Sequence, residues 1–183
     1  MKQLIVLMTL AAIASTPAFA QDYLTRNGKI SFFSSTPIED IEAVNNEVVS
    51  TLNTKTGEFN FRVAILGFKF EAVDMQKHFN DASYMNSAKF PRASFTGKIT
   101  DLSKVDFNTD GTYNVTVSGN LTIKDVTKPI TAAGSITVKN GKVTAKSEFK
   151  INRSEFNVSG QAIHEKKIAK TIEIKVDCTY DKR

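Results

Sequence analysis

Cysteine is almost absent from this chain of 183 residues, since Cys178 is the single one. One cysteine cannot form an internal disulfide, so the fold has to rest on its apolar core. We predict that Cys178 is a small buried residue in the last strand; an intermolecular disulfide is the alternative. Tryptophan is absent as well, whereas 13 phenylalanines are present. So many phenyl rings require an apolar interior of good size.

Long apolar runs are missing after the first 20 residues, so no transmembrane helix is predicted there. The start of the chain is different: Lys2 precedes an apolar stretch at 4–14, and Ala18-Phe19-Ala20 follows. This order is typical of a secretory signal peptide with cleavage after Ala20. We therefore expect a signal peptide at 1–20 and one domain at 21–183, located in the periplasm or outside the cell.

Strong charge of one sign is also missing. The net charge of +5 comes from lysines that are scattered along the chain, with no basic block interleaved with aromatic residues. This pattern gives no support for nucleic-acid binding. It leaves room for transient contact with an anionic membrane surface.

Catalytic signatures are the last absence. The chain has two histidines, and it contains no HExxH, no GxSxG, no cysteine pair and no glycine-rich phosphate loop. Asp74 and His78 lie four residues apart in a segment with helical spacing. They could form a metal site or an acid–base pair, but a solvated helix-supporting pair is the simpler interpretation. His164 is predicted to lie in a polar loop. We expect no catalysis, no cofactor and no metal.

Strict alternation of apolar and polar residues is the main positive signal. It runs through 113–124 and resumes at 130–139 after a short polar turn, which predicts a long antiparallel hairpin with one dry face. Asn140-Gly141 then predicts a tight turn into another alternating run at 143–151.

Further strands are predicted at 29–35, at the end of 41–53, and in 58–70, 92–100 and 168–180, with a helical insert at 71–89. About eight long, consecutive antiparallel strands favour a β-barrel. A barrel of this size either fills with side chains or holds one small ligand.

Small residues on the dry face do not show whether this face covers a packed core or a cavity. Gly119, Ala132 and Gly134 lie among larger inward residues of the central hairpin. They either pack against phenylalanines from opposite strands or outline a tunnel, and the residues alone do not choose between these possibilities.

Three segments of the chain resemble a known family. They are MQKHFNDASYMNSAKFPRASF at 75–95, GNLTIKDVTKPI at 119–130 and INRSEFNV at 151–158. Their order and spacing are similar to those of the YceI-like family of exported proteins, over nearly all of the chain after the signal peptide. The likeness is loosest at 41–70.

The resemblance implies an all-β fold: an extended, eight-stranded antiparallel, lipocalin-like β-barrel with a short helical insert. It also implies an apolar tunnel for an isoprenoid-type lipid or quinone-like ligand, and some family members are homodimers. The expected function is lipid binding for transport or storage. The alternatives are a structural or interaction module of the cell envelope, and a metal-dependent enzyme that uses Asp74 and His78.

Strand parity together with this resemblance gives a set of candidate tunnel-lining residues, and Arg153 is expected to have a structural role in which it binds neighbouring carbonyl groups. The candidate lining residues are Phe59, Phe61, Phe95, Val115, Val117, Leu121, Ala132, Gly134, Ile136, Phe149 and Ile174.

Overall fold

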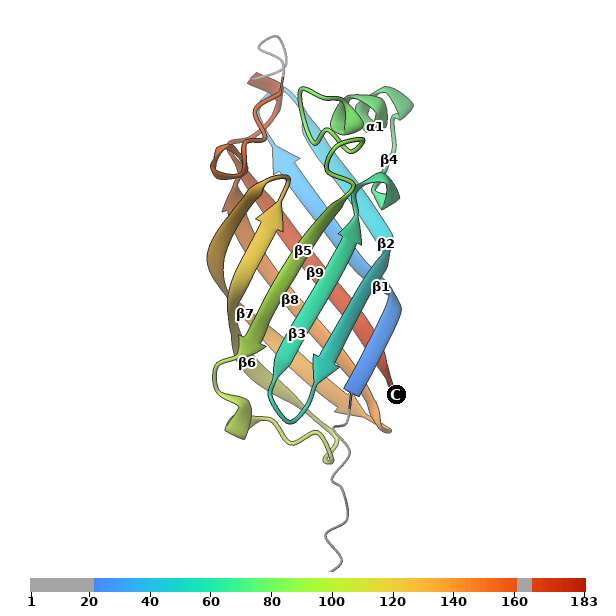
Figure 1. Ribbon diagram of the computed structural model, residues 1–183, viewed down its shortest axis with the longest axis vertical. Coiled ribbons are helices and arrows are strands. Elements are labelled where there is room, and N and C mark those ends of the chain that lie inside the picture. Colours follow the sequence, from blue (N-terminus) through green and yellow to red (C-terminus); the bar gives the residue numbers. More distant parts are fainter. Residues whose placement is uncertain (1–21, 161–165) are drawn as a thin grey trace, which may run out of the picture.

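A closed antiparallel β-barrel forms the body of the molecule, as the computed structural model shows for residues 22–160 and 166–183 (Figure 1). Each strand pairs with its neighbours in the order β1-β9-β8-β7-β6-β5-β3-β2, and pairing of β1 with β2 closes the ring. The predicted eight-stranded barrel is confirmed. The predicted signal peptide and His164 lie outside the described residues. The strands of the barrel are β1 (Asp22–Ser35), β2 (Asp40–Asn53), β3 (Glu58–Ala64), β5 (Arg92–Ile99), β6 (Gly111–Ile123), β7 (Val126–Lys139), β8 (Lys142–Asn152) and β9 (Thr171–Lys182).

The turn after β7 forms where the sequence predicted it, whereas the turn between β6 and β7 is shorter than predicted, because β7 begins at Val126 and not at residue 130. Asn140 and Gly141 connect β7 to β8, and both have positive φ angles of 52° and 75°. Two successive residues of that conformation suit the right-handed twist of a hairpin. Lys124, with φ of 55°, lies in the turn between β6 and β7.

The first two strands are longer than expected. β1 begins at Asp22 instead of Lys29, and the polar start of the segment 41–53 is strand as well. Register shifts between Thr25 and Gly28, and between Gly28 and Ile30, mark bulges in this pair. A bulge shifts the inward parity by one residue, so a search for unbroken alternation missed these parts.

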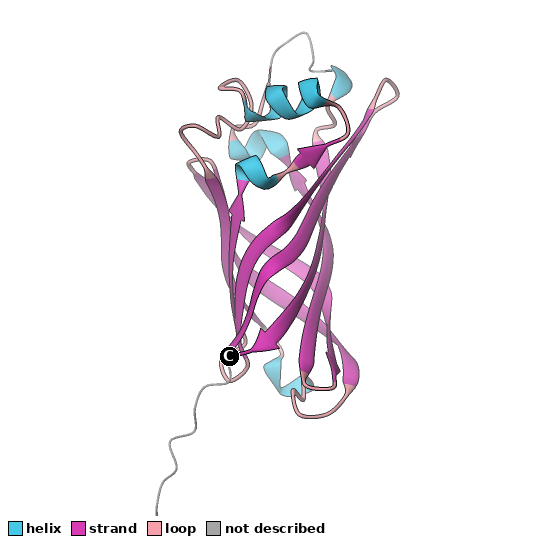
Figure 2. Ribbon diagram, turned by 90° about the vertical axis from the view of Figure 1, so that its right-hand side faces the viewer, coloured by secondary structure: helices cyan, strands magenta, loops and turns pink. Residues whose placement is uncertain are grey.

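Helical segments gather at one end of the barrel (Figure 2). They are α1 (Val73–Asn80), η1 (Ile65–Gly67) and η3 (Arg153–Phe156), and the two-residue strand β4 (Lys69–Phe70) pairs with β2 beside them. α1 confirms the predicted helical insert. Asp74 in its first turn and Lys77 in its last turn suit the helix dipole. We call this the α1 end.

The opposite end is a solid core, which we call the packed end. There β1, β2 and β9 contribute Tyr23, Leu52 and Tyr180, which are 2%, 0% and 0% exposed. The hydroxyl groups of Ser50 and Tyr180 lie 2.8 Å apart and share a buried hydrogen bond. The turn beyond this core carries η2 (Leu102–Lys104). The packed end therefore closes the barrel on that side.

Candidate ligand-binding cavity

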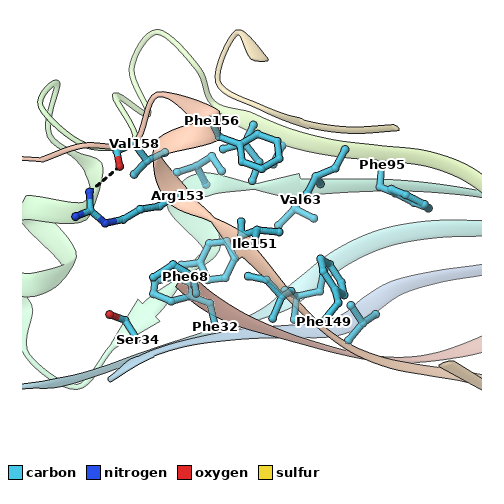
Figure 3. Close-up of a pocket in the computed structure, with 18 of the residues that line it drawn as sticks. Phe32, Ser34, Val63, Phe68, Phe95, Phe149, Ile151, Arg153, Phe156 and Val158 are labelled. Carbon is cyan, nitrogen blue, oxygen red and sulfur yellow. Dashed lines mark hydrogen bonds between the residues drawn. The ribbon is translucent and has the colours of Figure 1, made fainter. Parts of the chain in front are cut away.

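An elongated cavity of about 520 Å³ occupies the barrel between the packed end and α1. Its wall is mostly aliphatic and aromatic, and every long strand except β2 contributes several residues to it. Figure 3 shows side chains from opposite strands, including Val63, Phe95, Phe149 and Ile151, around this space. A volume of this order is typical of a site for a small organic molecule.

Many inward residues along this cavity are only partly buried, although they belong to the interior of the barrel. Phe95, Leu121 and Phe149 are of this kind, whereas inward residues at the packed end, such as Leu52 and Val143, are fully buried. The difference means that there is unfilled space beside the inner wall. The barrel is therefore hollow over this length.

The predicted lining residues lie on this wall with one exception. Phe59, Phe61, Phe95, Val115, Val117, Leu121, Gly134, Ile136, Phe149 and Ile174 all border the cavity.

Ala132 does not border the cavity. It lies opposite Val117 in the register of β6 and β7, and so belongs to the same face of the sheet. Contact of any of these residues with a ligand stays a prediction.

Small residues are not what makes the cavity, and of the two possibilities left open for Gly119 and Gly134 the structure favours close packing. Gly97 and Gly119 are paired across β5 and β6, and the ring of Phe95 covers both, since a Cβ on Gly119 would lie 2.7 Å from its Cζ atom. A Cβ on Gly134 would lie 2.6 Å from the carbonyl oxygen of Lys146. These glycines permit close approach of neighbouring groups and do not leave room for a ligand. A Gly134→Leu change would disturb β8 before it filled the cavity.

Four phenyl rings pack together at the α1 end. Phe79 of α1 lies 5.4 Å from Phe32, 5.6 Å from Phe68 and 5.1 Å from Phe70, measured between ring centroids. Phe32 also contacts Phe68 at 5.4 Å and Phe70 at 5.7 Å. Aromatic pairs at these distances are favourable beyond their burial. This aromatic cap is the main attachment of α1, which has no fully buried residue.

Arg153 holds the link that follows β8. Its Nε donates to the carbonyl oxygen of Ala169 at 3.0 Å, and one Nη donates to those of Val158 and Ser159 at 2.9 and 2.8 Å (Figure 3). The side chain is 5% exposed. The predicted structural role of Arg153 is confirmed.

Asp74 and His78 border the cavity at the α1 end, next to Glu39 and Lys167. The salt bridge between Lys167 and Glu39 measures 3.6 Å. Within residues 22–160 and 166–183, no three His, Cys, Asp or Glu side chains come together as a metal site. The polar residues at this end therefore form a rim around an apolar space.

Cys178 is buried in β9, as predicted, and is 0% exposed. Burial raises the pKa of its thiol from 9.0 to about 12, and the nearby charge of Asp177 adds to this effect. The thiolate is therefore suppressed at neutral pH. This position does not favour an intermolecular disulfide.

Sequence reasoning missed two groups of cavity residues. Ile130, Ile151 and Ile172 follow the same alternation as the predicted ones and could have been found from it. The aromatic cap could not, because its rings come from β1, β4, α1 and the segment before β4, and the contact depends on the tertiary fold.

Comparison with known proteins agrees with this architecture. A family model described as the YceI-like domain matches residues 19–180. Protein YceI of Salmonella arizonae is 28% identical over 139 residues, which are 73% of this chain and 60% of the Salmonella protein. Protein YceI of Salmonella newport gives the same values. The chain thus spans about 60% of the length of these curated relatives.

Solved structures share the fold at lower sequence identity. A polyisoprenoid binding domain from Saccharophagus degradans, implicated in plant cell wall breakdown, superposes with a TM-score of 0.77 at 12% identity, over 90% of this chain and 99% of that one. BcnA from Burkholderia cenocepacia gives 0.66 at 16% identity, over 84% and 96%. The YCEI protein of Campylobacter jejuni gives 0.57 at 20% identity, over 75% and 80%. These likenesses establish the shared barrel.

Proposed function

The chain belongs to the YceI-like family, and we propose that it holds a long-chain amphipathic lipid of the isoprenoid type inside its barrel, for transport or storage. The observation that carries the proposal is the continuous apolar cavity of about 520 Å³ that runs from the packed end to α1. The polyisoprenoid binding domain from Saccharophagus degradans, which has the same fold, supports this choice of ligand class.

Burial alone is a sufficient driving force for such a ligand. Each methylene group that moves from water into the cavity contributes about 0.8 kcal/mol. A chain of isoprene units needs a long dry wall and few polar contacts, and the wall of phenylalanine, isoleucine, leucine and valine side chains provides this. Specificity then depends on cavity length and on the polar head, and catalysis is not required.

Extraction of the native protein tests the proposal. The purified protein is analysed by native mass spectrometry and, after solvent extraction, by lipid mass spectrometry. We expect a bound long-chain lipid, or uptake of geranylgeraniol by delipidated protein. A protein that carries no lipid and takes up none would contradict the proposal and favour a structural module of the cell envelope.

A matched pair of variants connects binding to the cavity. Val117 borders the cavity from β6, and Asn120 is exposed on the outer face of the same strand. We expect Val117→Trp to fill the space and to lower geranylgeraniol uptake by about tenfold, because a filled site loses apolar contacts worth about 1.4 kcal/mol or more. Asn120→Trp adds the same ring outside and should bind like the wild type. Equal uptake by the two variants would place the lipid elsewhere.

Export to the periplasm or beyond is part of the proposal, with residues 1–20 as a signal peptide that is cleaved after Ala20. None of the helices in the described ranges is long and apolar enough to cross a membrane. N-terminal sequencing of the protein from a cell-envelope fraction checks the cleavage site. Transient membrane contact and homodimer formation also stay predictions; vesicle co-sedimentation and light scattering check them.

A further inference from the structure

One seam of the barrel is only half paired. The ladder between β7 and β8 runs from Lys139 opposite Lys142 to Gly134 opposite Ser147. Beyond that point β7 continues to pair with β6 as far as Val126, and β8 continues to pair with β9 as far as Asn152. Both stretches belong to the part of the chain that the structure describes, and no backbone pairing joins 126–133 to 148–152. Here the two strands separate.

Fixed contacts bound this opening at both ends. At the lower end, the hydroxyl group of Ser147 donates to the carbonyl oxygen of Ala133 at 2.7 Å. At the upper end, Lys124 in the β6–β7 turn donates to the carbonyl oxygens of Tyr84 and Asn157 at 2.9 and 2.7 Å. We call the opening between 128–133 and 148–152 the β7–β8 window.

The window leads directly into the cavity. Ile130 on its β7 side and Phe149 and Ile151 on its β8 side all border the cavity, and all three are partly exposed (Figure 3 shows the last two). Where the same seam is paired, Ile136 and Ala145 are 1% and 8% exposed. The unpaired part of the seam therefore lies beside the cavity.

The window edges are poorly suited to binding another strand. Pro129 has no N–H group to donate, and Lys128, Glu148 and Lys150 are exposed along the two edges. Proline and lysine on an open edge are features that disfavour strand addition. The unpaired backbone groups nevertheless require hydrogen-bond partners. Water or a polar ligand group meets this need better than a protein strand.

The charge near the window is positive. Glu148 is within 3.5 Å of Lys175 in a salt bridge, so its charge is offset. Lys128 and Lys150 take part in no salt bridge between described residues. An anionic group in the window would be attracted by both lysines.

We propose that a single-chain lipid enters the barrel sideways through the β7–β8 window, and that its anionic head, a phosphate or a carboxylate, stays in the window while its chain lies in the cavity. This inference rests on the proposed function. It places the head between two strands rather than at the α1 end, where the aromatic cap lies beside the polar rim of the cavity.

Blocking the window tests the route. Ala132 belongs to the inner face of β7 beside the window, and Asn120 is exposed on the outer face of β6. Ala132→Cys and Asn120→Cys are each labelled with a bulky maleimide; Cys178 is buried and does not compete. Uptake and release of cis-parinaric acid, a fluorescent polyene lipid, are then followed by stopped flow.

We expect the label at position 132 to slow uptake and release together by about tenfold, an added barrier of about 1.4 kcal/mol, because both directions cross the same passage. The label at position 120 should change neither rate. Equal rates in the two labelled proteins would overturn the lateral route. Failure of the unlabelled wild type to bind cis-parinaric acid would instead count against the proposed function.

Charge reversal tests the position of the head. We compare Lys128→Glu/Lys150→Glu at the window with Lys167→Glu at the α1 end, using geranylgeranyl monophosphate and geranylgeraniol. At low ionic strength the window variant should bind the monophosphate about fivefold or more weakly, in line with exposed charge pairs, and should bind the alcohol normally. Lys167→Glu should bind the alcohol normally and should weaken monophosphate binding less than the window variant does. Weakened monophosphate binding in Lys167→Glu alone would place the head at the α1 end and contradict the inference.

Discussion

The two halves of the barrel are built from the same strands and yet differ in what they enclose. At the packed end, Leu52, Val143 and Tyr180 are each 0% exposed. Toward α1, Leu121 and Phe149 continue the same inward alternation but border a cavity. One half is a packed protein core, and the other half encloses a cavity.

The placement of aromatic rings accounts for the difference. At the packed end, rings reach across the barrel: the centroids of Phe59 and Tyr180 lie 6.3 Å apart, although their strands are not neighbours. In the hollow half the ring of Phe95 instead lies over the glycine pair Gly97 and Gly119 on its own wall. A ring that lies along the wall covers backbone and leaves the centre empty. The alternation of a strand thus predicts which way a side chain points, but not what it meets.

Truncating one leucine in each half should show the largest difference in stability between the two halves. We expect Leu52→Ala to lower the free energy of unfolding by about 3 kcal/mol, because it opens a cavity in a filled core. Leu121→Ala removes the same atoms from a surface that already faces a cavity, so it should cost well under half as much. Urea unfolding of both variants, without bound lipid, measures the difference. Equal losses would show that the upper half is as tightly packed as the lower.

Alkaline pH should lower the stability of the packed end, with the second largest effect. Burial raises the pKa of Cys178 from 9.0 to about 12 and also raises the pKa of Tyr180 well above its usual range. The unfolded chain therefore loses these protons first, so stability is intact below about pH 9 and falls as pH rises toward the folded-state values. We expect a loss of about 2 kcal/mol by pH 10.

The slope of the unfolding free energy against pH separates this titration effect from a simple loss of packing. Cys178→Ala and Tyr180→Phe should each give a shallower decline between pH 9 and 11 than the wild type in unfolding experiments. A Val143→Ala control, which removes buried packing but no titratable group, should lower stability and keep the wild-type slope. Unchanged slopes in the first two variants would mean that these groups are not what titrates.

Removing one buried hydroxyl group should have the smallest effect of the three. Tyr180→Phe leaves the hydroxyl group of Ser50 without its partner at 2.8 Å, and we expect a loss of about 1 kcal/mol at pH 7. The double change Tyr180→Phe/Ser50→Ala should recover part of it, since no unpaired hydroxyl group remains. Additive losses in thermal or urea unfolding would contradict this coupling.

Much of the fold was predictable because regular strands and tight turns depend on local residue patterns. The alternation at 113–124 and 130–139 gave the central hairpin with the correct facing of its residues, and Asn140-Gly141 gave the turn into β8. The family segments gave closure into a barrel. The bulges of β1 and β2 escaped because the structure places polar Asn45 and Ser50 inside, at 0% and 1% exposure.

The cavity wall was largely predictable, but the origin of the cavity was not. Parity identifies inward residues, whereas the room inside depends on where rings from distant strands settle. Gly119 and Gly134 looked like free space in the sequence and proved to be sites of close approach. The β7–β8 window is equally invisible to local pattern, because both of its edges alternate as if they were paired.

Contacts between lipid and protein test most directly whether the hollow half of the barrel holds the lipid. Isotope-filtered nuclear Overhauser spectra of methyl-labelled protein with unlabelled geranylgeraniol would report which methyl groups touch the chain. The account predicts contacts to Leu121, Ile130 and Ile151 in the hollow half, and none to Leu52 or Val143 in the packed end. Contacts confined to outer-face residues, or no contacts at saturating lipid, would contradict the claim that the hollow half of this barrel is a lipid container.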